Sequence, residues 1–147
     1  MTIEEAYSLT TTEEAPKKIF IDVYTDWCGW CKRMDKATFQ KPEVAMYMNE
    51  NFYNVKFNAE QKEDIEILGN TFKFVAQGSR GYHELAAALL NGKMSYPTVL
   101  FMNGKFEMLS PVPGYQEVTA FLKVAHFFGD DAYKSTPWTS YSYEGTK

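Results

Sequence analysis

The two cysteines of the 147-residue chain, Cys28 and Cys31, are separated by two residues and follow an apolar, β-prone stretch over 19–24. The stretch predicts a strand, and the residues after the cysteines predict the start of a helix. A two-residue spacer at a helix start brings the two sulfur atoms close enough to form a disulfide. The first sulfur also lies near unpaired helix N–H groups and the positive end of the helix dipole, which stabilise a thiolate. This arrangement favours reversible thiol–disulfide exchange.

The cysteines have two other interpretations, namely half of a zinc site or a pair of inert thiols. A zinc site needs about four ligands, and the two histidines, His83 and His126, stand alone in predicted helices far along the chain. A disulfide between the cysteines closes a very small loop and adds little stability. We therefore predict a redox pair without a metal or another bound cofactor. Cys28, more exposed at the helix start, is expected to attack, and Cys31, more buried, to resolve the mixed disulfide.

The composition restricts the class of protein. A chain of 147 residues with 45% hydrophobic residues can form the core of one domain, and we expect a single, monomeric domain over 1–147. The net charge of -4, with scattered basic residues, gives no indication of nucleic-acid binding. No apolar run is long enough to insert across a membrane. Residues 1–12 lack the basic and apolar segments of a signal peptide, so none is predicted in this chain.

The elements that must position the cysteines follow in a regular order. The strand over 18–24 is apolar almost throughout, which is typical of a parallel strand buried on both faces. A helix is predicted from the cysteines to a point before Pro42, which fits the first turn of a second helix. The later predicted elements are a strand over 52–57, a hairpin over 65–74 around Gly69-Asn70, a helix over 82–90, a hairpin over 98–109 and a helix over 118–129. Residues 1–16 read as a polar lead-in with a helical turn near 3–9, and part of the aromatic tail over 129–147 is expected to lie on the body.

Four sequence features occur in order along this pattern. Residues 27–32 form a Trp-Cys-Gly-Trp-Cys-Lys motif, with Asp22 six residues before the first cysteine. Lys56 lies in the second predicted strand, and Tyr96-Pro97-Thr98 precedes a later one. Together with the order of elements, these features resemble the thioredoxin family over about 17–128. The resemblance implies an α/β thioredoxin fold, with a central mixed sheet flanked by helices and a β-hairpin insertion before the third helix.

The stretch Asp35-Lys36-Ala37-Thr38-Phe39 and the split second helix are closer to a subset of that family, which includes the thioredoxin-like domains of bacterial envelope disulfide-interchange proteins. This favours the periplasm or cell envelope over the cytoplasm. The spacer Gly29-Trp30 differs from the Gly-Pro of thioredoxin itself. Residues 59–80 read as an insertion relative to the minimal fold.

The resemblance also implies roles for Asp22 and Lys56. Asp22 falls where the family keeps a buried acid, and a buried carboxyl resists ionisation. It would take or give the proton of Cys31, with Lys56 moderating its charge. The alternative is a surface acid on a strand edge.

The residues beside the cysteines are expected to bind substrate. A cis Tyr96-Pro97 bond would hold backbone groups beside the sulfurs, where an extended substrate pairs with them; the alternative is an ordinary proline at a strand start. Trp27 is expected to pack under the motif, whereas Trp30, next to Gly29, is expected to be an exposed contact surface.

The sequence therefore predicts a thiol:disulfide oxidoreductase that acts on protein disulfides or dithiols and is recycled by an unidentified redox partner. The alternative is a peptide-binding or chaperone-like module in which the cysteines do not turn over. Because parallel strands present their carboxyl ends at one edge of a sheet, the hairpin over 65–74 and the turn over 77–81 are expected beside the sulfurs, near the Pro97 loop. The alternative places this insertion on the far side as a solvated decoration.

Overall fold

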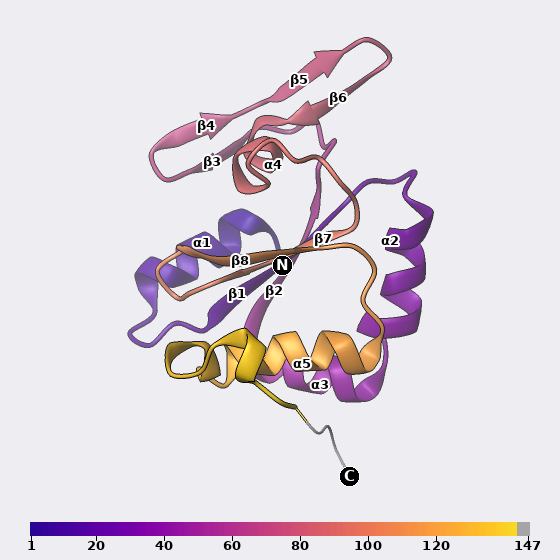
Figure 1. Cartoon of the computed structure of the whole chain (residues 1–147). Coiled ribbons are helices and arrows are strands. Elements are labelled where there is room, and N and C mark those ends of the chain that lie inside the picture. Colours follow the sequence, from indigo (N-terminus) through magenta and orange to yellow (C-terminus); the bar gives the residue numbers. More distant parts are fainter. Residues whose placement is uncertain (144–147) are drawn as a thin grey trace.

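A four-stranded mixed sheet forms the centre of the protein in the computed structural model, which describes residues 1–143 (Figure 1). The strand order is β2-β1-β7-β8. β1 (Lys18–Tyr24) pairs in parallel with β2 (Phe52–Asn58) and antiparallel with β7 (Thr98–Met102), which pairs antiparallel with β8 (Met108–Pro113). The predicted α/β class and mixed sheet are confirmed.

Helices cover both faces of this sheet (Figure 1). One layer contains α1 (Ile3–Thr12) and α4 (Glu84–Leu89), and the other contains α2 (Gly29–Met34), α3 (Pro42–Asn51) and α5 (Val118–Gly129). α2 runs directly into a π-helical turn, η1 (Asp35–Phe39), in which the N–H of Gln40 donates to the carbonyl of Asp35. Pro42 begins α3 as predicted, because the missing N–H of proline costs nothing in the first turn of a helix.

Alternate residues of β1 face the two layers, because successive side chains of a strand point to opposite sides. Ile19, Ile21 and Val23 are buried in the core shared with α1 and α4. Phe20 is buried in the core shared with α3 and α5. Asp22 shares the face of Phe20, so its carboxyl points into the layer that contains α2 and η1.

α1 is longer than the predicted turn over 3–9. The Oγ of Thr2 accepts the N–H of Glu5, and the Glu5 carboxylate accepts the N–H of Thr2, which together form a capping box. Ile3 and Ala6 are buried against the sheet. The helix therefore gains its stability from its N-cap and from one small apolar face, although its sequence is mostly polar.

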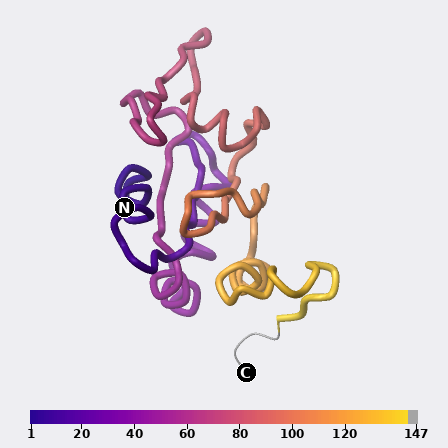
Figure 2. The backbone as a smooth tube through the Cα atoms, turned by 90° about the vertical axis from the view of Figure 1, so that its left-hand side faces the viewer, coloured from indigo at the N-terminus to yellow at the C-terminus, as the bar shows by residue number. Residues whose placement is uncertain are grey.

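The segment between β2 and α4 forms two hairpins instead of the one predicted. The first consists of β3 (Ile65–Ile67) and β4 (Asn70–Phe72), and the second of β5 (Phe74–Gln77) and β6 (Arg80–His83). The first turn consists of Leu68 and Gly69, one residue earlier than expected, and both have positive φ. Both hairpins extend beyond the sheet at one end of the molecule (Figures 1 and 2).

His83 lies at the start of α4 and not inside it, which corrects the predicted helix over 82–90. Its Nδ1 accepts the N–H of Leu85 at 3.2 Å, and its Nε2 lies 3.0 Å from the carbonyl oxygen of Glu63. The side chain is fully buried. His83 is therefore the N-cap of α4. Tyr82 fits the helical spacing of the sequence, but it lies in β6 because β6 pairs with β5.

The described part of the aromatic tail lies on α5, as expected (Figure 2). The rings of Trp138 and Tyr141 contact Phe127 at centroid distances of 5.2 and 5.0 Å, and Tyr143 stacks on His126 at 4.5 Å. Two short 3-10 turns, η2 (Ala132–Lys134) and η3 (Trp138–Ser140), shape this segment. None of the helices in residues 1–143 is long and apolar enough to cross a lipid bilayer.

Candidate active site

Cys28 and Cys31 form a disulfide where the chain leaves β1 and enters α2. Cys28 is the N-cap of α2, and its Sγ accepts the backbone N–H of Cys31 at 3.1 Å. Its carbonyl accepts the N–H of Lys32, which continues the helix. An N-cap sulfur receives both a hydrogen bond and the favourable end of the helix dipole, and both stabilise a thiolate.

The two cysteines are buried to the same degree. Cys28 is 5% exposed and Cys31 6% exposed, so the expectation that Cys28 is the more exposed residue is wrong. The difference between the two lies in their surroundings. Cys28 occupies the N-cap beside Trp27, whereas Cys31 lines a cavity on the Asp22 side of the helix. The assignment of Cys28 as the attacking thiol stays a prediction and rests on the N-cap.

Asp22 is buried behind this pair, with 4% of its surface exposed, so the alternative of a surface acid is wrong. It lines a cavity of about 260 Å³ together with Cys31, Asp35 and Lys56. Within residues 1–143, its Oδ1 has no hydrogen-bond partner. Burial raises the pKa of Asp22 to about 6; the positive charge of Lys56 opposes this rise and the negative charge of Asp35 adds to it. Asp22 can therefore change its protonation near neutral pH.

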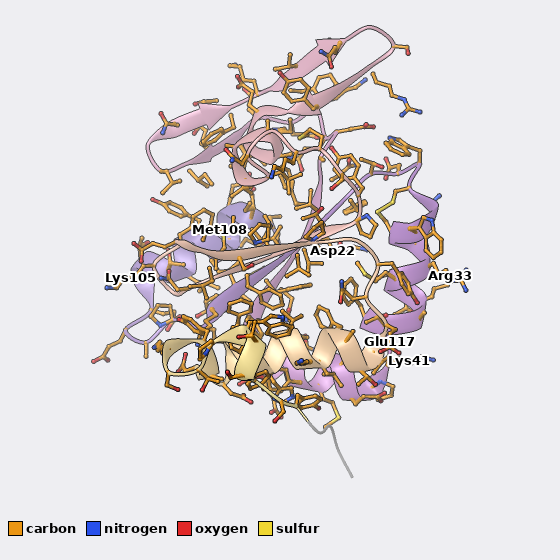
Figure 3. All side chains as sticks on the ribbon, viewed as in Figure 1. Asp22, Arg33, Lys41, Lys105, Met108 and Glu117 are labelled. Atoms are coloured by element: carbon orange, nitrogen blue, oxygen red, sulfur yellow. A yellow bond between two sulfur atoms is a disulfide. The ribbon has the colours of Figure 1, made fainter. Side chains whose placement is uncertain are left out.

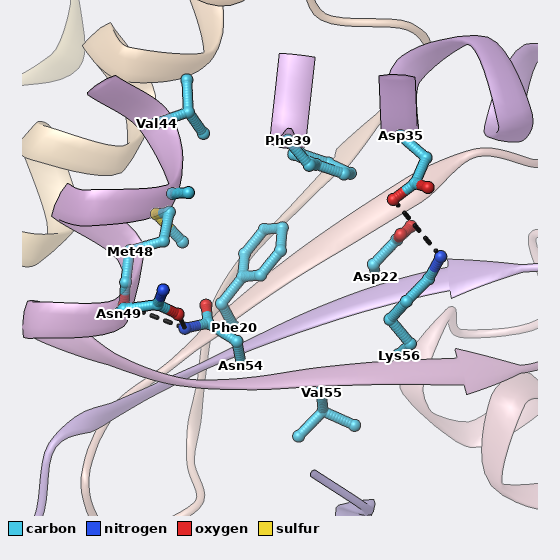
Figure 4. Close-up of a pocket in the computed structure, with 11 residues that line it drawn as sticks. Phe20, Asp22, Asp35, Phe39, Val44, Met48, Asn49, Asn54, Val55 and Lys56 are labelled. Carbon is cyan, nitrogen blue, oxygen red and sulfur yellow. Dashed lines mark hydrogen bonds and ion pairs between the residues drawn. The ribbon is translucent and has the colours of Figure 1, made fainter. Parts of the chain in front are cut away.

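Lys56 lies directly across from Asp22 in the register of β1 and β2. Its Nζ is 3.4 Å from Oδ1 of Asp35 and 5.0 Å from the ring centre of Tyr24. Figure 4 shows the side chains of Asp22, Asp35 and Lys56 converging from β1, the end of α2 and β2 beside a smaller cavity of about 160 Å³. The predicted proximity of Lys56 to Asp22 is thus observed, and the role of each residue stays a prediction.

Asp35 belongs to this group but was not singled out from the sequence. It stands four residues after Cys31, which places both side chains on one face of the helix. Gln40 donates to its Oδ2 at 3.0 Å, which helps to fix the carboxylate that faces Lys56. The four-residue spacing was the signal that could have identified it.

Trp27 does not pack under the motif, which corrects that expectation. Its side chain is 51% exposed. Its indole Nε1 donates to Oε2 of Glu60 at 3.0 Å. Its ring makes an edge-to-face contact with the ring of Tyr96, at a centroid distance of 6.0 Å. The guanidinium of Arg80 lies 4.6 Å from the indole centre. Polar partners for the indole edge thus hold Trp27 at the surface.

Trp30 is exposed, as expected, at 56% of its surface. It contacts the ring of Tyr115 at 5.4 Å and the guanidinium of Arg33 at 5.3 Å. Figure 3 shows Arg33 projecting outward from α2, away from the interior position of Asp22. Gly29, between the two tryptophans in the sequence, is also exposed.

The Tyr96-Pro97 peptide bond is cis, as predicted. Pro97 is buried, and its carbonyl accepts the N–H of Gly114 at 2.8 Å. In residues 1–143, neither the N–H nor the carbonyl of Tyr96 has a hydrogen-bond partner. The free backbone donor and acceptor thus belong to the residue whose ring contacts Trp27, the neighbour of Cys28 in the chain.

The insertion is only partly where the sequence placed it. The turn over 77–81 reaches Trp27, the residue before Cys28, because the guanidinium of Arg80 lies over its ring. The hairpin of β3 and β4 instead packs toward α1, and Ile65 and Ile67 join the core that contains Ile3. That half of the expectation is wrong, since buried isoleucines hold the first hairpin against the N-terminal helix.

No group of three or more histidine, cysteine, aspartate or glutamate side chains in residues 1–143 is arranged to hold a metal ion. The polar groups around the cysteines are arranged instead as a thiol pair, a buried acid and a lysine–carboxylate pair.

Comparison with known proteins relates the chain to thiol–disulfide proteins. A family model named Thioredox_DsbH, described as "Protein of unknown function, DUF255", matches residues 3–123. Spermatogenesis-associated protein 20 of Rattus norvegicus is 30% identical over 79 residues, 54% of this chain. Thiol:disulfide interchange protein DsbD of Vibrio vulnificus is 34% identical over 61 residues, 41% of this chain. The matched segment is 10% of the length of each of these two relatives.

The structure resembles a thioredoxin-fold protein from Helicobacter pylori with a TM-score of 0.63 and 22% sequence identity. The alignment covers 82% of this chain and 74% of that protein. At this level of identity the likeness concerns the fold, and it agrees with the mixed sheet and flanking helices described above.

Proposed function

The chain belongs to the Thioredox_DsbH (DUF255) family and has the thioredoxin fold with a Cys-x-x-Cys disulfide, and on this premise we propose that it exchanges disulfides with protein substrates. The observation that carries the proposal is the disulfide whose Cys28 sulfur accepts a helix N–H. The match to a thiol:disulfide interchange protein supports it.

The exchange takes two steps. In the reduced protein, the Cys28 thiolate attacks one sulfur of a substrate disulfide, and the other substrate sulfur leaves as a thiolate. Cys31 then loses its proton and attacks Cys28, which breaks the mixed disulfide and releases the second substrate thiolate. The protein ends as the Cys28–Cys31 disulfide, and two electrons have passed to the substrate. A partner dithiol returns them, and the same steps in reverse oxidise a substrate.

Asp22 serves the second step in this proposal. The cavity that it shares with Cys31 gives water a path between the carboxylate and the thiol. A carboxylate with a pKa of about 6 accepts a proton more readily than an exposed aspartate does. Lys56 limits how far burial raises that pKa, and Asp35 holds the lysine in place.

Tyr96 supports a peptide substrate. Its backbone N–H and carbonyl have no partner within residues 1–143, so an extended segment can pair with them as an added strand does. The exposed rings of Trp27 and Trp30 would offer apolar contacts to such a segment. A module that binds peptides without redox turnover would use the same groups, so turnover separates the two functions.

The test is turnover of a protein disulfide with a thiol reductant, together with the reduction potential measured against glutathione. We expect the protein to accelerate reduction and to have a potential between about -270 and -120 mV, the range of dithiol couples on this fold. The Cys28→Ser/Cys31→Ser double variant is the control and is expected to lose all acceleration. Equal peptide binding by both proteins, with turnover by neither, contradicts the proposal and supports the binding module.

The compartment and the oligomeric state remain proposals. The match to DsbD supports the preference for the cell envelope. We also propose that the protein is monomeric, which size-exclusion chromatography with light scattering checks.

A further inference from the structure

Trp27 is held at the surface by three segments that are far apart in the sequence. Glu60 follows β2 and accepts the indole N–H, Tyr96 precedes the cis-proline, and Arg80 belongs to β6. The indole nevertheless remains 51% exposed. A tryptophan beside an N-cap sulfur, fixed in orientation and open to solvent, is suited to contact a bound partner.

Arg80 is the first residue of β6 in the β5–β6 hairpin. The turn of this hairpin has two residues, Gly78 and Ser79, with Gly78 at a φ of +64°, a conformation that favours glycine. Gly81 follows, and the ring of Phe74 packs where a side chain at that position would lie. Arg80 thus projects from a short hairpin with a two-residue turn.

The charge around the disulfide differs from that of the whole chain. Arg80 lies on one side, and Lys32, Arg33 and Lys36 lie along the exposed side of α2 and η1. Within residues 1–143, no carboxylate forms an ion pair with any of these four residues.

The nearby acids are fewer, and among those the structure describes only Asp35 forms an ion pair. Asp35 pairs with Lys56. Glu60 accepts the indole N–H of Trp27, and Asp26 accepts the side-chain amide N–H of Asn58; both donors are neutral, so these two carboxylates keep their charge. The surface that surrounds the cysteines is therefore basic in a chain whose net charge is -4.

We propose that Arg80 and Trp27 form a docking site for an acidic, extended, cysteine-containing segment of a partner protein, so that the β5–β6 hairpin selects the substrate. The proposal rests on the proposed function. The segment pairs with the backbone of Tyr96, places its cysteine against Cys28, and directs an acidic side chain toward Arg80. Arginine suits this position because its planar group stacks on the indole and still presents N–H donors to a carboxylate.

The test compares two peptide disulfides that differ only in the residues next to the cysteine, glutamate in one and lysine in the other. We expect the wild-type protein to have a kcat/KM about fivefold higher for the acidic peptide, which is the size of an exposed ion pair. This preference is expected to shrink as salt is added, because salt screens exposed charges. Arg80→Glu is expected to reverse the preference.

Turnover of hydroxyethyl disulfide, which is small and uncharged, corrects each variant for any general loss of redox activity. Lys105→Glu is the matched control, since it makes the same change of charge at the far end of the molecule from Arg33 (Figure 3). That variant is expected to keep the preference for the acidic peptide. If Arg80→Glu keeps the wild-type preference, or if Lys105→Glu loses it to the same extent, the docking site is wrong.

A second measurement separates this proposal from the proposed function. Serine analogues of the two peptides are titrated onto the Cys28→Ser/Cys31→Ser variant with and without Arg80→Glu. Tighter binding of the acidic analogue, reversed by Arg80→Glu, supports the docking site even if the wild-type protein turns over no disulfide. Equal binding of the two analogues overturns it even if turnover is rapid.

Discussion

Replacing Cys28 by serine is expected to slow disulfide exchange by at least about 1,000-fold, because the chain then has no thiol at the N-cap to attack a substrate. Serine keeps the cap, since its oxygen accepts the same N–H of Cys31. The fold is therefore expected to survive, which circular dichroism and thermal unfolding check. The rate of reduction of a protein disulfide gives the effect on activity.

Replacing Cys31 by serine is expected to leave the first attack intact and to prevent the second. The protein then accumulates a mixed disulfide between Cys28 and the substrate, which mass spectrometry detects as a covalent adduct of one substrate molecule. Differential alkylation of the reduced wild-type protein is an independent check. Faster labelling of Cys31 than of Cys28 at mildly acidic pH reverses the two roles, a result that matters because both residues are equally buried.

The elements next to the cysteines were predictable because local chemistry determines them. The apolar run over 18–24 specifies a central strand, and Pro42 can begin a helix but cannot lie inside one. Asp22 was identified because the family resemblance places a buried acid there and an apolar run favours burial, and the structure buries it. The match between Asp22 and Lys56 was implied by the family resemblance, and the two residues are opposite each other in the neighbouring parallel strands β1 and β2.

The exposure of side chains around the cysteines was not predictable from local pattern. Trp27 lies at the surface because its indole contacts Glu60, Arg80 and Tyr96 there. These three residues belong to three other segments of the chain. Tyr96 and the turn over 77–81, which contains Arg80, were expected near the cysteines, but their contact with the Trp27 indole was not. The position of Arg80 depends on a second hairpin whose strands are only four residues long, too short to show a clear alternation.

Competition between elements explains the remaining differences. Tyr82 and His83 fit a helical pattern, but they pair with β5, so α4 begins later. The polar residues of α1 suggest only one turn, yet Thr2 and Glu5 cap a full helix. In both places a tertiary or capping contact outweighs the average tendency of the segment.

Replacing Asp22 by asparagine is expected to slow the resolving step by about 100-fold above pH 6, the usual size of a lost general base. Asp22 ionises near pH 6, so in the wild-type protein the rate of resolution is expected to rise through that pH. In the variant this rise is expected to disappear, while the first attack by Cys28 is unchanged. Stopped-flow measurement of the decay of a preformed mixed disulfide follows the resolving step by itself.

Variants of the two charged residues near Asp22 test whether the pH dependence of the resolving step is due to ionisation of Asp22. Burial raises the pKa of Asp22, Asp35 raises it further, and Lys56 lowers it. Asp35→Asn is therefore expected to move the midpoint of the rise to lower pH, and Lys56→Met to higher pH. If both variants keep the wild-type midpoint, the group that titrates near pH 6 is not Asp22.

The stability of the same Asp22→Asn variant gives a second readout with a definite sign. The pKa of Asp22 is about 6 in the folded protein and has an ordinary value of 3.8. Below pH 3.8 the carboxyl is protonated in both states and does not affect stability. Between these values the unfolded chain ionises first, so the stability of the wild-type protein falls as the pH rises. Above pH 6 the cost is complete and on the order of 3 kcal/mol.

Asparagine carries no charge at any pH, so it removes this cost where the cost exists. We expect Asp22→Asn to raise the free energy of unfolding by up to about 3 kcal/mol at pH 8 and to leave it nearly unchanged at pH 3.5. Urea unfolding at the two pH values measures the difference. A variant that is slower in resolution and more stable only at high pH identifies Asp22 as an acid retained for its chemistry. Equal stabilisation at both pH values instead indicates a packing effect that is unrelated to ionisation.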